Sequence, residues 1–180
     1  YHEVAELAYF GSHVLHPKAM VPVIDRGIPM YIRNTFNPTS MGTKISTPQT
    51  STLHTSSTSY VKGFSSIDRV SLISVEGRGM VGVPGIAKRL FDALSRLGVS
   101  VIMISQASSE YSICLAVHES DETQSVKAIK EAFKLELHHQ KIKTIGVKSQ
   151  CSIIAAVGDQ MIHQAGIAAL FFEALGKANI

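Results

Sequence analysis

The sequence has few charged residues and no long apolar run. Only 17% of its 180 residues are charged and the formal net charge is +3, which is too little positive charge for the basic surface that nucleic-acid phosphates require. No apolar run approaches the roughly 20 residues that span a bilayer. The opening stretch, YHEVAELAYF, contains acidic residues and is unlike a signal peptide. The composition therefore predicts neither a nucleic-acid nor a membrane partner.

Cysteine is also scarce. The two cysteines, Cys114 and Cys151, lie inside apolar runs, which favours buried small side chains over redox or metal chemistry. The eight histidines are scattered without metal-ligand spacing, so we predict no metal site. Cysteine usage of this kind fits a reducing compartment, and we expect a cytoplasmic location.

The 45% of hydrophobic residues can build a core for one ordinary domain or two small ones. Residues 1–45 combine a helical pattern with two short strands, predicted at 21–24 (VPVI) and 28–34 (IPMYIRN). Residues 46–60 are nearly all Ser, Thr and other polar types, which is typical of a linker. The chain starts in mid-pattern and stops where a strand should begin, so we expect a piece of a longer protein.

The pattern after the linker is regular. Apolar periodicity predicts strands at 69–77, 99–105, 111–117 and 142–148, with helices at 84–97 and 122–139. The order is βαββαβ. Nine residues between Gly77 and Val99 recur with the same spacing between Gly158 and Ile180, always 81 positions later. We therefore predict an α+β fold with one complete unit at 61–149 and a truncated second copy at 150–180.

The stretch 74-SVEGRGMVGVPGIAKRLFDAL-94 contains the spacing G-x-G-x-x-G at Gly77, Gly79 and Gly82. A dinucleotide loop also needs an acid at the end of the second strand and its third glycine at the helix start. The strand VSVIMISQ has no acid, and Pro84 and Gly85 precede the helix. We interpret the loop as a strand-to-helix turn whose amides could hold the carboxylate of a small molecule.

These segments carry a family resemblance. The stretch ELAYFGSHVLHPKAMVPVIDRGIPMYIRNTFNPTSMGTKIS resembles the C-terminal end of the aspartokinase catalytic domain, which has an α/β amino acid kinase fold. The βαββαβ unit and its partial copy resemble the ferredoxin-like tandem ACT regulatory domains that follow it. Residues 61–113 are most similar to the threonine-sensitive, bifunctional aspartokinase and homoserine dehydrogenase enzymes.

The resemblance implies a parent enzyme that phosphorylates aspartate with MgATP at the start of threonine, methionine and lysine biosynthesis. This chain has no Gly-rich loop ending in Lys-Ser or Lys-Thr and no carboxylate pair placed for magnesium, so we predict no catalytic residue, no cofactor of its own and no kinase activity.

The role that the resemblance leaves for this chain is regulation of the enzyme. The resemblance implies an amino acid effector, expected to be threonine, and a homodimer formed through the ACT domains. Two alternatives stay open, which are a lysine-sensitive monofunctional aspartokinase and an ACT dimerisation module that binds no effector. The effector-binding residues carried over from the family are Met80, Val83, Gly85, Ile86, Ser100, Val101, Gln106, Ser109 and Glu110.

Overall fold

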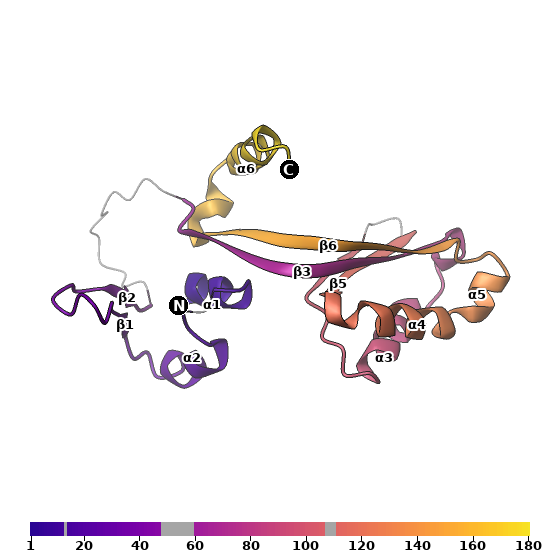
Figure 1. Cartoon of the computed structure of the whole chain (residues 1–180), viewed down its shortest axis with the longest axis horizontal. Helices are drawn as coiled ribbons and strands as arrows, with labels where there is room; N and C mark the ends of the chain where they lie inside the picture. Colours follow the sequence, from indigo (N-terminus) through magenta and orange to yellow (C-terminus); the bar gives the residue numbers. More distant parts are fainter. Residues whose placement is uncertain (13, 48–59, 107–110) are drawn as a thin grey trace. The chain divides into compact units, whose positions relative to one another are not determined.

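The structure is a computed structural model that describes residues 1–12, 14–47, 60–106 and 111–180. The chain divides into two compact units, which we call the sheet unit (Ile67–Ile153) and the terminal unit (Tyr1–Ser66 with Ile154–Ile180). The strands are β1 (Met30–Ile32), β2 (Thr43–Ile45), β3 (Gly63–Glu76), β4 (Met103–Gln106), β5 (Ser112–His118) and β6 (Thr144–Val157) (Figure 1). The α-helices are α1 (His2–Tyr9), α2 (Pro17–Ile24), α3 (Ile86–Ser95), α4 (Glu122–Ala132), α5 (Lys134–His138) and α6 (Ile167–Lys177), with short 3₁₀ helices η1 (Arg78–Met80), η2 (Glu119–Asp121) and η3 (Asp159–His163).

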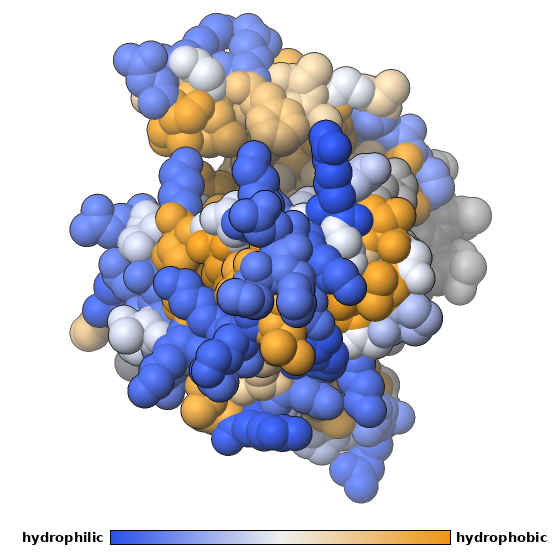
Figure 2. Space-filling model, turned by 90° about the vertical axis from the view of Figure 1, so that its right-hand side faces the viewer, coloured by the Kyte–Doolittle hydropathy of each residue, from blue (hydrophilic) through white to orange (hydrophobic). Residues whose placement is uncertain are grey.

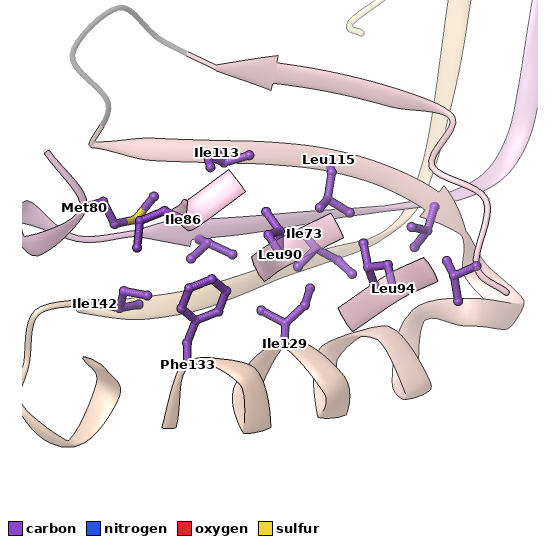
Figure 3. Close-up of a cluster of buried hydrophobic side chains, with 13 residues drawn as sticks. Ile73, Met80, Ile86, Leu90, Leu94, Ile113, Leu115, Ile129, Phe133 and Ile142 are labelled. Carbon is purple, nitrogen blue, oxygen red and sulfur yellow. The ribbon is translucent and has the colours of Figure 1, made fainter. Parts of the chain in front are cut away.

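The sheet unit is built on a four-stranded sheet with the order β4-β5-β3-β6. Strand β5 pairs antiparallel with β3, from Val70↔His118 to Glu76↔Ser112, and with β4, from Met103↔Ala116 to Gln106↔Ile113. Helices α3 and α4 cover one face of this sheet (Figures 1 and 3). This is the α+β, βαββαβ arrangement that the sequence predicts, and its class is confirmed.

Apolar side chains from both layers form the core of the sheet unit (Figure 3). Along β3, side chains alternate between the two faces, and this places Ile73 and Val75 on the helix side, where both are fully buried. Helix α3 buries Ile86, Leu90 and Leu94, which recur every four residues and so share one face. The 3.6-residue and 2-residue periods in the sequence thus predict the correct faces.

The predicted helix at 122–139 is in fact two helices. Helix α4 ends at Ala132, and the buried Phe133, with φ −112°, separates it from α5. The Arg89 guanidinium lies 4.7 Å from the centre of the Phe133 ring and donates hydrogen bonds to the Ala132 carbonyl and the Glu136 carboxylate. We attribute the break to this tertiary contact, since the apolar period continues across it.

The prediction of a strand at 21–24 is wrong. These residues close helix α2, which starts with Pro17 at its first position and with the His16 side chain accepting a hydrogen bond from the Lys18 amide. Proline is well suited to a helix start because its fixed φ is helical and its missing N–H has no partner there. Burial of Met20 then holds the helix, and the β-branched residues that suggested a strand are included in it. The strand predicted at 28–34 is confirmed in part as β1.

The internal repeat is present in the backbone. Strand β6 begins and ends 81 residues after β3, at Thr144 against Gly63 and at Val157 against Glu76. Left-handed φ values recur at the same spacing, at Arg69 (55°) and Gln150 (56°), at Gly85 (88°) and Gly166 (89°), and at Gly98 (69°) and Asn179 (59°). The first copy is residues 63–99 and the second copy is residues 144–180. Local conformation therefore repeats at the ends of the strand, at the start of the helix and at the turn after it.

Candidate effector site

A small hollow lies beside the turn between β3 and α3. Its volume is about 220 Å³, and it is formed by the η1 turn, the first turn of α3, the end of β4 and the start of β5. The residues that line it are Met80, Val83, Pro84, Gly85, Ile86, Ala87, Gln106 and Ile113.

Five of the nine predicted effector residues meet in this hollow, namely Met80, Val83, Gly85, Ile86 and Gln106. Two others do not line it. Ser100 is exposed and Val101 packs against the core, both ahead of the point where β4 begins. The last two, Ser109 and Glu110, lie outside the described residues.

Three lining residues, Pro84, Ala87 and Ile113, were not among the predicted ones. Ile113 is the register partner of Gln106 across β4 and β5, so pairing of these two strands brings it to the hollow. The sequence did not identify Ile113 as a site residue, because the other core residues of this strand are apolar too.

Among the described residues, the hollow is lined by backbone donors and by no charged side chain. The N-cap residue of helix α3 is Gly85, whose φ is 88°, and no side chain caps the helix there. The first amides of an α-helix have no intrahelical acceptor, and the helix dipole adds partial positive charge at this end. Gln106 contributes the one side-chain amide among the lining residues. This set of groups fits a carboxylate at the helix start and a small polar or apolar side chain beside it.

The glycines of the G-x-G-x-x-G stretch serve packing and turning. A Cβ at Gly77 or at Gly79 would collide with the backbone of Lys141, and the Gly79 amide donates a hydrogen bond of 2.9 Å to the Lys141 carbonyl. Gly82 has a left-handed φ of 67°, which glycine adopts without strain. The amide of Gly79 is therefore used within the protein, which agrees with the interpretation of the loop as a strand-to-helix turn.

The other sequence-based expectations concern cysteines, metals and membranes. Both cysteines are free, and burial, helped by the Glu76 charge, raises the pKa of the Cys114 thiol. Across the described residues, no three histidine, cysteine or acidic side chains are grouped so that they could hold a metal ion. In the same part of the chain, every helix is too short or too polar to cross a bilayer.

The comparison with known families agrees with this architecture. Residues 73–133, which run from β3 to the end of α4, match the family model of an ACT domain. In this region the chain is similar to an ACT domain, and along its length it is similar to aspartokinases. Over all 180 residues it is 44% identical to bifunctional aspartokinase/homoserine dehydrogenase 2, chloroplastic, of Arabidopsis thaliana. It is 41% identical to the bifunctional aspartokinase/homoserine dehydrogenase of Haemophilus influenzae. The resemblance drawn from the sequence is confirmed.

Solved aspartate kinases share the fold of this chain. The Clostridium acetobutylicum enzyme superimposes with a TM-score of 0.81 at 26% identity, over 100% of this chain and 39% of that one. Escherichia coli aspartokinase III, in complex with aspartate and ADP, gives a TM-score of 0.71 at 20% identity, over 97% and 37% of the two chains, which is evidence for the fold alone. This chain spans only about a fifth of the length of the curated relatives, 20% for the Arabidopsis protein.

Proposed function

We propose that this chain is the regulatory region of an aspartate kinase and that the hollow at the start of α3 binds an amino acid effector, threonine. The parent enzyme phosphorylates aspartate with MgATP at the start of threonine, methionine and lysine biosynthesis. Its relatives are named as aspartokinases, and a solved neighbour was crystallised with aspartate and ADP. The observation that carries the effector proposal is the pairing of uncapped helix amides with the Gln106 side chain in one hollow.

The charge of the hollow favours threonine over lysine. No acidic side chain is present among the described residues that line it. The side-chain ammonium of a bound lysine is matched best by a carboxylate, whereas a threonine hydroxyl needs only a neutral donor or acceptor such as Gln106. Glu110, the acidic residue among the predicted ones, lies outside the described residues. A structural neighbour, E. coli aspartokinase III, was solved with lysine and aspartate, so lysine remains the alternative effector to test.

The helix amides and the Gln106 side chain would bind different groups of the ligand. The α-carboxylate fits the amides at Gly85 and Ile86, because partial positive charge is concentrated at a helix N-terminus. The volume of about 220 Å³ fits a small amino acid. Met80 and Ile113 would then face the aliphatic part of the ligand, and both side chains are buried.

The same region supports a homodimer. Strand β4 is at the edge of the sheet, all four of its residues are exposed, and Ile104 is 53% exposed. An edge strand with free hydrogen-bonding groups and apolar side chains is a natural place for pairing with a second subunit. The alternative that the ACT domain acts only as a dimerisation module rests on this same strand. The cytoplasmic location stays a prediction, and the Arabidopsis relative is named as chloroplastic.

Replacement of Gln106 tests the effector site. The substitution Gln106→Ala should leave a polar group of bound threonine without its partner, at a cost of about 1–3 kcal/mol, or roughly 5- to 150-fold in affinity. Calorimetric titration of this chain with threonine measures the affinity directly. In the full-length enzyme the same change should weaken inhibition by threonine and leave uninhibited kinase activity nearly unchanged, since allosteric coupling is a difference in ligand affinity between two states.

The matched control is Gln160→Ala, which removes an exposed glutamine from η3 in the terminal unit. It should bind threonine as the wild type does. Equal threonine affinity in the Gln106→Ala and wild-type proteins would remove Gln106 from the site. Binding of lysine alone would reassign the effector, and binding of no amino acid by a dimeric wild-type chain would support the dimerisation module.

A further inference from the structure

A second and larger hollow lies at one end of the sheet unit, where β3 ends and β6 begins. Its volume is about 1040 Å³, and it is formed by the start of η1, the residues that open β5, the end of α5 and the residues that lead into β6. This end of the sheet unit faces the viewer in Figure 2, where hydrophilic residues gather with smaller apolar areas between them. Pockets for small-molecule ligands usually measure roughly 300–1,000 Å³. The hollow is therefore large enough for a ligand bigger than a free amino acid.

Three charged side chains line this larger hollow. Arg78 and Lys143 supply two positive charges, and Glu76 supplies one negative charge. All three residues are exposed, and among the described residues none of the three side chains has an ion pair or a hydrogen bond. Two cationic side chains in one hollow favour an anionic ligand, and a phosphate monoester carries a charge of about −1.5 to −2 at pH 7. The charges therefore favour a phosphate group.

Two backbone amides near the hollow are already used within the protein. The Gly77 amide donates a hydrogen bond of 3.0 Å to the Tyr111 carbonyl. The Gly79 amide donates one of 2.9 Å to the Lys141 carbonyl. A phosphate in this hollow would therefore be bound by the two cationic side chains. An arginine guanidinium presents paired N–H groups to two phosphate oxygens, and a lysine ammonium adds a point charge.

The rest of the hollow is partly aromatic and apolar. Tyr111 is 49% exposed, Leu137 is half-buried and Ile142 is buried. A half-exposed aromatic ring offers a face on which a flat base can stack. The Glu76 carboxylate would repel a free phosphate ion, but it accepts hydrogen bonds from the hydroxyl groups of a sugar. These residues therefore favour a phosphate that is joined to a sugar and a base.

We propose that this larger hollow binds a mononucleotide. The phosphate is bound by Arg78 and Lys143. The ribose hydroxyls donate hydrogen bonds to Glu76, and the base packs on Tyr111. A dicarboxylic amino acid would match the three charges, but it has no flat group for the aromatic ring. The larger hollow shares no lining residue with the candidate effector site, so a failure of threonine to bind there would leave this proposal standing.

Calorimetric titration of this chain with adenosine monophosphate tests the proposal. Adenosine and inorganic phosphate are titrated separately, because each supplies only one part of the ligand. Adenosine monophosphate should bind, and each of the two parts should bind at least roughly tenfold more weakly, since it makes only some of the contacts. No binding of adenosine monophosphate at millimolar concentration would overturn the proposal. Equal affinity for inorganic phosphate would also overturn it, because the hollow would then be an anion site that does not recognise a base.

Three variants locate the binding in this hollow. Arg78→Gln and Tyr111→Ala should each lower the affinity for adenosine monophosphate roughly tenfold, because one loses a phosphate contact and the other a stacking surface. Tyr111→Phe keeps the ring and should bind as the wild type does. The matched control is Lys148→Gln, which removes an exposed lysine of β6 that does not line the hollow and should leave the affinity unchanged. Wild-type affinity in Arg78→Gln, or an equal loss in Lys148→Gln, would contradict the proposal, and thermal unfolding of each variant confirms that its fold is intact.

Discussion

Helices α3 and α6 come from two copies of one strand–helix repeat, and the same backbone has a different environment in each. The turns agree in detail, since Met80 and Met161 donate to Gly77 and Gly158 at 3.2 and 3.1 Å. Burial does not agree. Helix α3 has three buried residues, and α6 has none. The turn geometry is set by nearby residues, whereas burial depends on segments that come from elsewhere in the chain.

The largest difference in the cost of a substitution between the two copies is expected at a core position. Leu90 is fully buried in the first copy, and its counterpart Phe171 is only partly covered, with its ring stacked on Phe64 at 6.2 Å. Leu90→Ala should cost about 3–5 kcal/mol of unfolding free energy, because it removes buried methyl groups and leaves a cavity. Phe171→Ala should cost this 180-residue chain less than about 2 kcal/mol. Urea unfolding of both variants measures the two values, and equal losses would show that α6 is packed as tightly as α3.

Where the copies share backbone geometry, we expect a smaller loss of unfolding free energy, and the same loss in both copies. Gly85 and Gly166 have φ values of 88° and 89°, and a Cβ at either position would meet open space. Alanine at each site should therefore cost about 1 kcal/mol from backbone strain alone. The comparison of Gly85→Ala with Gly166→Ala by urea unfolding sharpens the contrast with the core positions. A twofold or greater difference between them would contradict the view that local geometry is independent of burial.

The smallest effect concerns a polar cluster of the sheet unit, here called the polar clip, which includes Ser71 of the first copy. The Glu122 carboxylate on α4 accepts hydrogen bonds from Ser149 on β6 at 2.5 Å and from the buried Ser71 on β3 at 2.6 Å. These bonds, with that from Ser149 the larger cause, lower the pKa of Glu122 below its ordinary value of 4.5. A lowered folded-state pKa gives stability that is fully present above the unfolded-state value and is lost as the pH falls through the folded-state value.

Unfolding measured between pH 3 and pH 7 tests this contribution. Loss of stability below about pH 4.5 should become shallower in Glu122→Gln, because glutamine does not titrate over this range. Ser71→Ala should reduce it in part, while the control Ser152→Ala, an exposed serine at the equivalent position of the second copy, should not. An unchanged pH profile in Glu122→Gln would mean that the clip contributes no pH dependence.

Sequence reasoning succeeded where the signal is periodic. The alternation on β3 and the four-residue spacing of Ile86, Leu90 and Leu94 predict the sheet, the helix and their facing sides. It failed at residues 21–24, because Val and Ile suggest a strand while the helix start comes from His16 and from burial of Met20. For the candidate site, the family resemblance named turn residues and Gln106 that line the hollow, but it did not name Ile113, since only the strand register brings that residue there.

The sequence by itself determined the repeat, the βαββαβ order and the turns before α3 and α6, because these depend on glycine positions and on apolar periods of two to four residues. Tertiary structure alone decided that helix 122–139 breaks at Phe133, where Arg89 binds the Ala132 carbonyl, and that the amide of Gly79 is used by Lys141. It also decided that Leu90 is buried and Leu170 is not. These outcomes depend on which segment packs against which, and no local pattern in the chain contains that information.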